Sequence, residues 1–223
     1  MIDRLRTLLA PPADDDAWGF DPRFVSASQP LLDVLYDRWW RVTVTGAEQV
    51  PASGRVLIAA NRCGGEPWDA AMIATAVRRH AGRDLRTLGP KAVFALPWAG
   101  TVARRAGSVP DRAANAERLL GEDHAVLVFP ERGDPAARHR VGRLGRGEFV
   151  ETALRAGAPI VPCAVVATSP APLPARWRIE FCAPFDLSAY GPDAASDRRL
   201  VLDCSDAVRE LIQAKIYENL VKS

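Results

Sequence analysis

The chain has 223 residues, a length that fits one domain with a sizeable hydrophobic core. Hydrophobic residues make up 48% of it and charged residues 25%, a balance that is typical of folded globular proteins and excludes a disordered or fibrous one. The formal net charge is only +2, so the composition gives no electrostatic basis for binding nucleic acid.

Apolar periodicity and turn residues divide the chain into alternating helices and strands. Residues 1–21 are predicted to form a mobile lead-in, because Pro11 and Pro12 are followed by three consecutive aspartates. In chain order the expected elements are a helix over 22–38, strands over 39–45 and 55–60, a helix over 69–80, a strand over 85–88, helices over 96–106 and 111–121, a strand over 125–129, a helix over 147–156, strands over 159–167 and 177–182, and a C-terminal helix over 201–220.

This alternation predicts a single α/β domain over residues 22–223, built on a mixed, mostly parallel sheet flanked by helices. The run 125–129 is wholly apolar, as central parallel strands are, and Asp111 is placed to cap the helix that follows it. In such sheets ligands bind beyond the carboxyl ends of the strands. The loops 61–68 and 130–146 leave apolar strands at that edge, and together they form the candidate site.

The cysteines and the apolar segments indicate the cellular compartment of the protein. The cysteines are scattered with no CxxC pair, so we expect free thiols in a reducing cytoplasm and neither a metal site nor a disulfide framework. The N-terminus has no apolar core of a signal peptide, and the longest nearly apolar run, 156–167, is about a dozen residues and too short to span a bilayer. An excess of arginine over lysine, with abundant alanine and proline, is typical of a GC-rich bacterial genome.

Four short motifs in chain order resemble those of the phospholipid and glycerol acyltransferase family, which includes bacterial lysophosphatidic acid acyltransferases. They are the segments 61–69 (Asn-Arg-Cys-Gly-Gly-Glu-Pro-Trp-Asp), 107–112 (Gly-Ser-Val-Pro-Asp-Arg), 129–131 (Phe-Pro-Glu) and 160–162 (Ile-Val-Pro). Each motif is weak alone, but four in order at plausible spacing are specific. The resemblance runs from residue 39 to residue 167 and continues more weakly toward the C-terminus.

The resemblance implies acyl transfer from acyl-CoA or an acyl carrier protein to a lysophospholipid or another hydroxyl acceptor, with no cofactor besides the donor. It also implies a cytoplasmic location, peripheral on the inner membrane face, where the arginines would meet an anionic lipid surface. Asp69 and Glu131 take supporting catalytic roles, and Arg112 matches the arginine that holds the acceptor phosphate. The remaining substrate-binding positions implied in this way are Arg132, Gly64, Gly65, Phe129, Pro130 and Pro162.

Two departures from the family pattern bear on activity. The family's general-base histidine is replaced by Arg62, which keeps its proton at every physiological pH. Asp69 then has no imidazole to orient, and we expect an Arg62–Asp69 ion pair instead. Arg132 stands where the third motif normally has glycine, and it would crowd or recharge the acceptor pocket.

Other groups compete for the role of base or nucleophile. Cys63 is either a nucleophile that forms a thioester or an inert loop cysteine, and Glu66 and His139 are candidate bases. His80 and His124 are expected to be surface or turn residues. Two hypotheses therefore stand: an acyltransferase impaired by the lost histidine, or an inactive pseudoenzyme that binds a lipid or a partner protein.

Overall fold

A seven-stranded sheet organises the part of the chain that the computed structural model describes, which is residues 16–63, 65, 67–131, 140–142 and 144–222. The strand order is β1-β7-β6-β2-β5-β3-β4, and all neighbours are parallel except β6 and β7. The strands are β1 (Thr43–Thr45), β2 (Val56–Ala60), β3 (Leu85–Gly89), β4 (Ser108–Pro110), β5 (Ala125–Val128), β6 (Ile160–Ala167) and β7 (Trp177–Phe181). The predicted mixed, mostly parallel sheet is confirmed.

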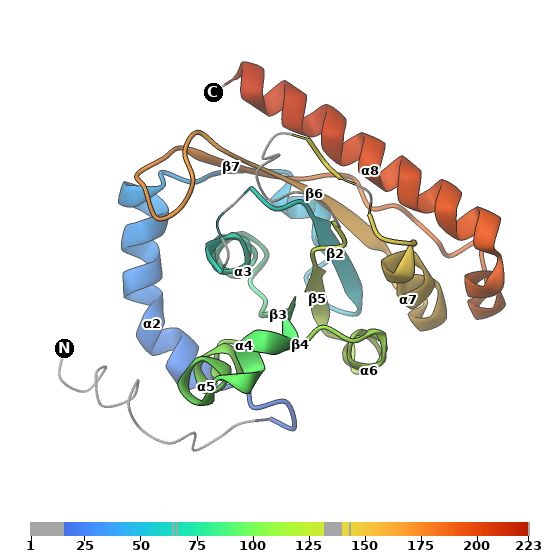
Figure 1. Ribbon diagram of the computed structural model, residues 1–223, viewed down its shortest axis with the longest axis horizontal. Helices are drawn as coiled ribbons and strands as arrows, with labels where there is room; N and C mark the ends of the chain where they lie inside the picture. The colour runs from blue at the N-terminus through green and yellow to red at the C-terminus, as the bar shows by residue number, and fades with distance from the viewer. Residues whose placement is uncertain (1–15, 64, 66, 132–139, 143, 223) are drawn as a thin grey trace.

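Helices cover both faces of this sheet (Figure 1). One face carries α3, with α2 and α5 outside it, and the other carries α6, α7 and α8. The helices are α2 (Pro22–Val34), α3 (Trp68–Ala81), α4 (Lys91–Ala95), α5 (Pro97–Arg105), α6 (Ala113–Gly121), α7 (Glu148–Ala156) and α8 (Arg198–Val221), with a π-helical turn (Leu35–Trp39) and 3-10 turns (Ala47–Gln49 and Pro192–Ser196) between them. The expected α/β architecture is therefore observed.

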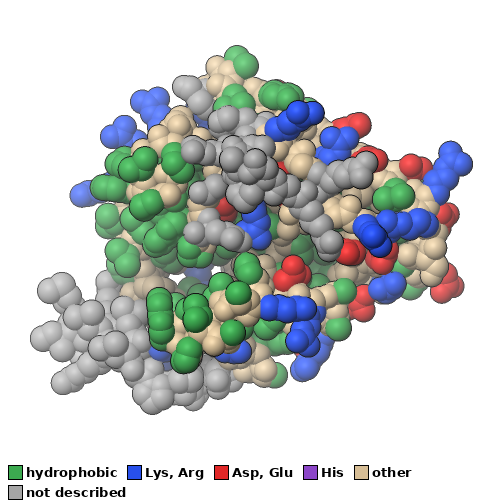
Figure 2. Space-filling view, in the orientation of Figure 1, with side chains coloured by type: hydrophobic (Ala, Val, Ile, Leu, Met, Phe, Trp, Pro, Cys, Tyr) green, Lys and Arg blue, Asp and Glu red, His purple; other side chains and the backbone are tan. Residues whose placement is uncertain are grey.

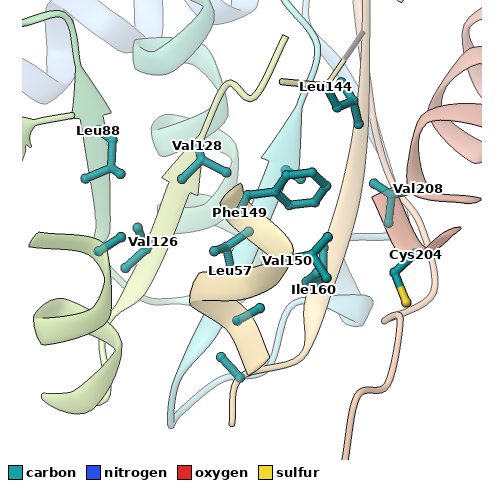
Figure 3. Packing of buried hydrophobic residues seen from close by; sticks show 14 of the residues in the cluster. Leu57, Leu88, Val126, Val128, Leu144, Phe149, Val150, Ile160, Cys204 and Val208 are labelled. Carbon is teal, nitrogen blue, oxygen red and sulfur yellow. The ribbon is translucent and has the colours of Figure 1, made fainter. Parts of the chain in front are cut away.

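The hydrophobic core lies on both sides of the central strands, because alternate residues of a strand point to opposite faces. Leu57 of β2 packs under α6 and α7, whereas its neighbour Ile58 packs under α3. Every residue of β2, β5 and β6 is buried. Figure 3 shows the first of these layers, with Phe149 of α7 extending over the strand that carries Leu57. Burial on both faces explains why these strands appear in the sequence as continuous apolar runs.

The predicted strand 39–45 is partly wrong, because its first residues close a helix. Trp40 N donates to Leu35 O at 2.8 Å, an i to i−5 bond that ends α2 in a π-helical turn. Arg41 then adopts a left-handed conformation with φ +43°, and the strand begins only at Thr43. Aromatic residues favour strands in general, but here Trp40 is buried in the core beneath the turn.

The expected cap at Asp111 is also wrong, because that residue prolongs an edge strand. Residues Ser108–Pro110 pair with β3, and Asp111 N donates to Gly89 O at 2.9 Å. Helix α6 therefore begins later, with Arg112 as its N-cap and no side-chain capping bond. A strand of three residues gives too little pattern for sequence periodicity to detect.

Residues 16–21 of the predicted lead-in pack on the rest of the protein. Phe20 and Asp21 are buried, and the Asp16 carboxylate pairs with Arg86. Residues 1–15 lie outside the described residues. No helix in the described ranges combines the length and the apolar character that a membrane span needs.

Candidate functional site

The loop after β2 begins at Asn61, whose side chain ties it to the neighbouring strand. The buried Asn61 amide donates from Nδ2 to Val165 O at 2.9 Å, and its Oδ1 accepts from Val165 N at 2.7 Å. The side chain thus makes both hydrogen bonds that a backbone peptide would make with β6. This fixes the point where the loop leaves the sheet.

Asp69, at the start of α3, holds the loop from inside the protein. Its side chain is buried, Oδ1 accepts from Cys63 Sγ at 2.9 Å, and Oδ2 accepts from Gly65 N at 3.2 Å. Gly65 is required by close approach, since a Cβ there would lie 3.0 Å from the Trp177 ring and 3.2 Å from Asp69 Oδ1. Cys63 is buried as well, so its thiol serves the Asp69 carboxylate as a hydrogen-bond donor.

Burial raises the pKa of Asp69 above its ordinary value, although the bonds from Cys63 and Gly65 and the charge of Arg62 act in the opposite direction. A native pKa above the unfolded value of about 3.9 means that the folded protein binds this proton more tightly than the unfolded chain. Asp69 therefore contributes less to stability as the pH rises from the unfolded pKa through the native one.

We accordingly expect the free energy of unfolding of the wild type to fall, relative to that of the Asp69→Asn variant, as the pH rises from about 4 toward 7. Urea unfolding of both proteins across this range measures the difference. The two proteins can differ in unfolding free energy by a constant amount for other reasons. Only the part of this difference that varies with pH reports on the Asp69 proton. A difference that stays flat, or that grows in favour of the wild type, would contradict the raised pKa.

Arg62 lies at the wall of a cavity that is described below. The centre of its guanidinium is 4.6 Å from the centroid of the Phe129 ring. Burial lowers the pKa of Arg62, while the charges of Asp69, Glu131 and Asp111 favour its protonated form. Asp69 thus acts on Arg62 through its charge. The hydrogen bonds that the Asp69 carboxylate accepts come from Cys63 and Gly65.

Glu131, just after β5, joins two loops of the site. Its Oε2 accepts from Arg62 N at 3.2 Å, and its Oε1 accepts from Gly142 N at 2.7 Å. Both carboxylate oxygens are therefore engaged by backbone donors. The bond from Arg62 N also fixes the backbone position of residue 62 at the edge of the cavity.

The cavity itself has a volume of about 480 Å³ and lies between the ends of β2, β3 and β5 and the helices α6 and α7. Its floor is mainly apolar and its rim is charged. The floor is formed by Leu57, Leu88, Ala116, Val128, Leu144, Phe149 and Thr152. The charged rim residues are Arg62, Asp111, Arg112, Glu131 and Glu148. Such a cavity suits a ligand with an apolar body and a polar or charged end.

The predicted site residues divide into three groups in the structure. Arg62, Arg112, Phe129, Pro130 and Glu131 line the cavity together. Asp69, Cys63, Gly65 and Pro162 are absent from the described lining: the first three form the support of the loop, and Pro162 is buried within β6 opposite Ala59. Gly64, Glu66, Arg132 and His139 lie outside the described residues.

Sequence inspection missed Glu148, Asp111 and Phe149 as parts of the cavity wall. Glu148 and Phe149 belong to the first turn of α7, which the sequence gives only as an amphipathic helix. The described histidines lie elsewhere: His80 Nε2 is 3.5 Å from the hydroxyl of Tyr36, and His124 lies beside Glu122.

Comparison with known proteins supplies the family context. A family model described as Acyltransferase matches residues 41–166 of this chain. Uncharacterized proteins of Mycobacterium tuberculosis and Mycobacterium bovis are each 35% identical to it over 247 residues, covering 92% of this chain and 69% of the relative. An uncharacterized protein of Mycobacterium leprae is 34% identical, with 92% of this chain and 67% of the relative covered.

A solved structure shares the fold. The crystal structure of PlsC, the 1-acyl-sn-glycerophosphate acyltransferase from Thermotoga maritima, superposes with a TM-score of 0.64 at 16% sequence identity. The match covers 86% of this chain and 80% of that one. At such low identity the likeness establishes the arrangement of strands and helices.

Proposed function

The chain belongs to the acyltransferase family, and on this premise we propose that its cavity binds an acyl donor and a lysophospholipid or another hydroxyl acceptor. The donor is acyl-CoA or an acyl carrier protein, and acyl transfer is impaired. The observation that carries the proposal is the position of Arg62, whose guanidinium lies over Phe129 at the cavity wall, where the family pattern has a general base.

The cavity supports the ligand class through its division into two zones. The apolar floor formed by residues such as Leu57 and Leu144 gives an acyl chain a surface on which it loses contact with water. Arg112 at the rim presents a planar guanidinium, which recognises phosphate by paired hydrogen bonds. A lipid with one acyl chain and one phosphate has both features.

The chemistry explains why we expect slow transfer. When the acceptor hydroxyl attacks the donor thioester, its proton has to move to a base as the carbon–oxygen bond forms. Arg62 is already protonated, so it can stabilise the negative charge that develops on the thioester oxygen but cannot take this proton. Glu131 has both oxygens engaged by backbone donors, and Asp69 lies behind the cavity wall, where it accepts the bond from Cys63.

A second candidate function is a binding module without turnover. The observation that favours it is the charge around Arg62: burial lowers the pKa of its guanidinium, and the charges of Asp69, Glu131 and Asp111 act against that shift. A guanidinium, which stays protonated at physiological pH, suits the recognition of an anion better than proton transfer. The same cavity would then retain a lipid or phosphate ligand, and measured turnover distinguishes the two functions.

The proposed place of action is the cytoplasmic face of the inner membrane, with peripheral attachment to an anionic lipid surface. Support comes from large apolar side chains that are exposed on α2 and α5. They are Leu31, Val34, Trp98 and Val102. Figure 2 shows hydrophobic side chains gathered over these two helices. Trp98, 75% exposed, has the amphipathic ring that lies readily among lipid headgroups.

The test is calorimetric titration of a short-chain lysophosphatidic acid, in parallel with CoA release from a panel of acyl-CoAs. Arg112→Gln is expected to weaken acceptor binding at least about tenfold, since a hydrogen bond to a charged group contributes about 1.5–3 kcal/mol. The matched control is Arg118→Gln, which removes a charge from the same helix where Arg118 pairs with Glu122 outside the cavity. This control should change the affinity by less than about twofold.

Three results would contradict the proposal. If the wild type binds neither the lysolipid nor an acyl-CoA, or if the Arg112 and Arg118 variants lose affinity equally, the cavity is not the ligand site. If the wild type releases CoA at ordinary enzymatic rates, above about 1 s⁻¹, transfer is not impaired.

A further inference from the structure

A second groove lies at the other end of the sheet, where β1, β6 and β7 meet. Its volume is about 590 Å³, and it shares no lining residue with the cavity described above. The groove is lined by Arg38, Trp39, Arg41, Thr168, Pro174, Ala175 and Arg176. Three of these seven side chains are arginines, and none is acidic.

Hydrogen bonds between its two walls hold this arginine groove in shape. Ala175 N donates to Trp39 O at 3.3 Å, and the Trp39 indole Nε1 donates to Pro172 O at 2.7 Å. Across the β6–β7 connection, Thr168 N donates to Arg176 O at 3.1 Å and Arg176 N donates to Thr168 Oγ1 at 3.0 Å. The groove is therefore formed by ordered backbone, with the indole of Trp39 as a fixed wall.

The backbone at Arg41 adopts a conformation that side chains other than glycine rarely take. Its φ is +43°, in the left-handed region. A residue held there is maintained by the surrounding contacts, and such conformations concentrate at binding sites. The turn brings Arg41 into the groove together with Arg38, which lies three residues earlier in the chain.

The positive charge of the groove is balanced by no ion pair within the described part of the chain, although the charge of Asp37 acts on Arg38. The ion pairs found there include none with Arg38, Arg41 or Arg176. The neighbouring carboxylate of Asp37 is already engaged, since Arg79 donates to it from Nη1 at 2.7 Å and from Nη2 at 2.8 Å. Figure 2 shows basic side chains gathered at the upper left, where Figure 1 places the end of α2 beside the β6–β7 connection.

From these observations we propose that the arginine groove binds a phosphate group. Three guanidinium groups supply positive charge, and each can donate paired hydrogen bonds to the oxygens of a phosphate group. The Thr168 hydroxyl adds a donor, because its oxygen accepts from Arg176 N while its own hydrogen can point toward the ligand. The phosphate belongs either to a lipid headgroup or to a free phosphoester, and the proposal does not depend on acyl transfer in the other cavity.

The test compares two double variants that each remove two positive charges. Arg38→Gln/Arg176→Gln changes the groove, and Arg199→Gln/Arg209→Gln changes α8, where both arginines lie beside acidic side chains. The probes are pyrophosphate, by calorimetry, and vesicles of phosphatidylglycerol with phosphatidylcholine, by cosedimentation. Low ionic strength keeps the exposed charges unscreened. Each single groove variant is measured too, with a thermal melt, so that the comparison survives if the double variant is unstable.

We expect the groove variant to bind at least about tenfold more weakly than the wild type, and the α8 variant to stay within about twofold. Binding of pyrophosphate would show that a phosphate group without a lipid is a sufficient ligand. Binding confined to phosphatidylglycerol vesicles, with none to pure phosphatidylcholine, would identify the headgroup as the source. The proposal is overturned if the wild type binds neither probe, or if the two double variants lose affinity equally. Neither result would bear on lysolipid binding at Arg112.

Discussion

Replacing Arg62 with histidine is expected to raise the rate of CoA release at least about a hundredfold over the wild type, because a positioned general base contributes roughly 10²–10⁴ in rate. The backbone of residue 62 is held by Glu131, so the new imidazole starts from a fixed point at the cavity wall. Imidazole loses its proton near pH 6.5, and Asp69 is near enough for its charge to act on this position. The gained activity should therefore increase as the pH rises through the imidazole pKa.

The matched control is Arg62→Gln, which removes the guanidinium without supplying a base. It should be no faster than the wild type, so that any gain in the histidine variant belongs to the imidazole. CoA release is followed with the same acyl-CoA and acceptor panel for all three proteins. If the histidine variant binds both substrates and still releases no CoA, the absence of an imidazole at position 62 does not explain the slow transfer proposed for the wild type.

Substituting Asp21 with alanine is expected to cost about 3–5 kcal/mol of unfolding free energy, the usual penalty for leaving one member of a buried ion pair alone. Arg105 donates to Asp21 Oδ2 from Nε at 3.0 Å and from Nη2 at 2.8 Å. Both side chains are less than 10% exposed, at 7% and 4%. The other oxygen, Oδ1, caps α2 by accepting from Arg23 N and Phe24 N.

The pH dependence of this contribution has a definite sign. Burial raises the pKa of Asp21, but the bonds from Phe24 and Arg105 outweigh it, and the pKa lies below its usual value. The stabilisation is thus present above the unfolded pKa of about 3.9 and is lost as the pH falls through the native one.

Urea unfolding of two variants separates the buried pair from ordinary surface charge. Asp203→Ala breaks the pair with Arg199, in which the side chains are 93% and 72% exposed, and should cost less than about 1 kcal/mol. An Asp21→Ala loss as small as that of Asp203→Ala would show that the buried pair contributes little.

The central elements of the fold could be predicted from sequence because their pattern is strong. The strands β2, β5 and β6 are wholly buried runs bounded by turn residues, and all three were predicted to within one or two residues. Edge elements were harder: β4 has three residues, and its continuation to Asp111 depends on a bond to Gly89, which no local pattern indicates. The prediction of a strand starting at Trp39 was wrong for the same reason: the helix continues to this point because Trp40 is buried in the core, and the local sequence does not indicate this burial.

The site could be located from sequence, but the roles within it could not. The loops 61–68 and 130–146 were expected at one edge of the sheet, and Glu131 does join them. The support of Asp69 by Cys63 was not foreseen, because hydrogen bonding within a loop depends on side-chain directions that spacing does not fix. Glu148 of α7 also lines the cavity. It was not predicted because α7 is distant in sequence from both loops and its pattern indicates only an apolar face.

The Asn61 side chain has a consequence for which substitutions the loop after β2 can accept during evolution. Its amide imitates a peptide group toward Val165, with one donor and one acceptor side by side. Aspartate lacks the donor, and glutamine is longer by one methylene, so few side chains could take its place. Since this anchor precedes position 62, the residue there can be exchanged chemically while its location in the molecule is kept. One substitution at this position can in this way change the chemistry of the cavity wall without rebuilding the cavity around it.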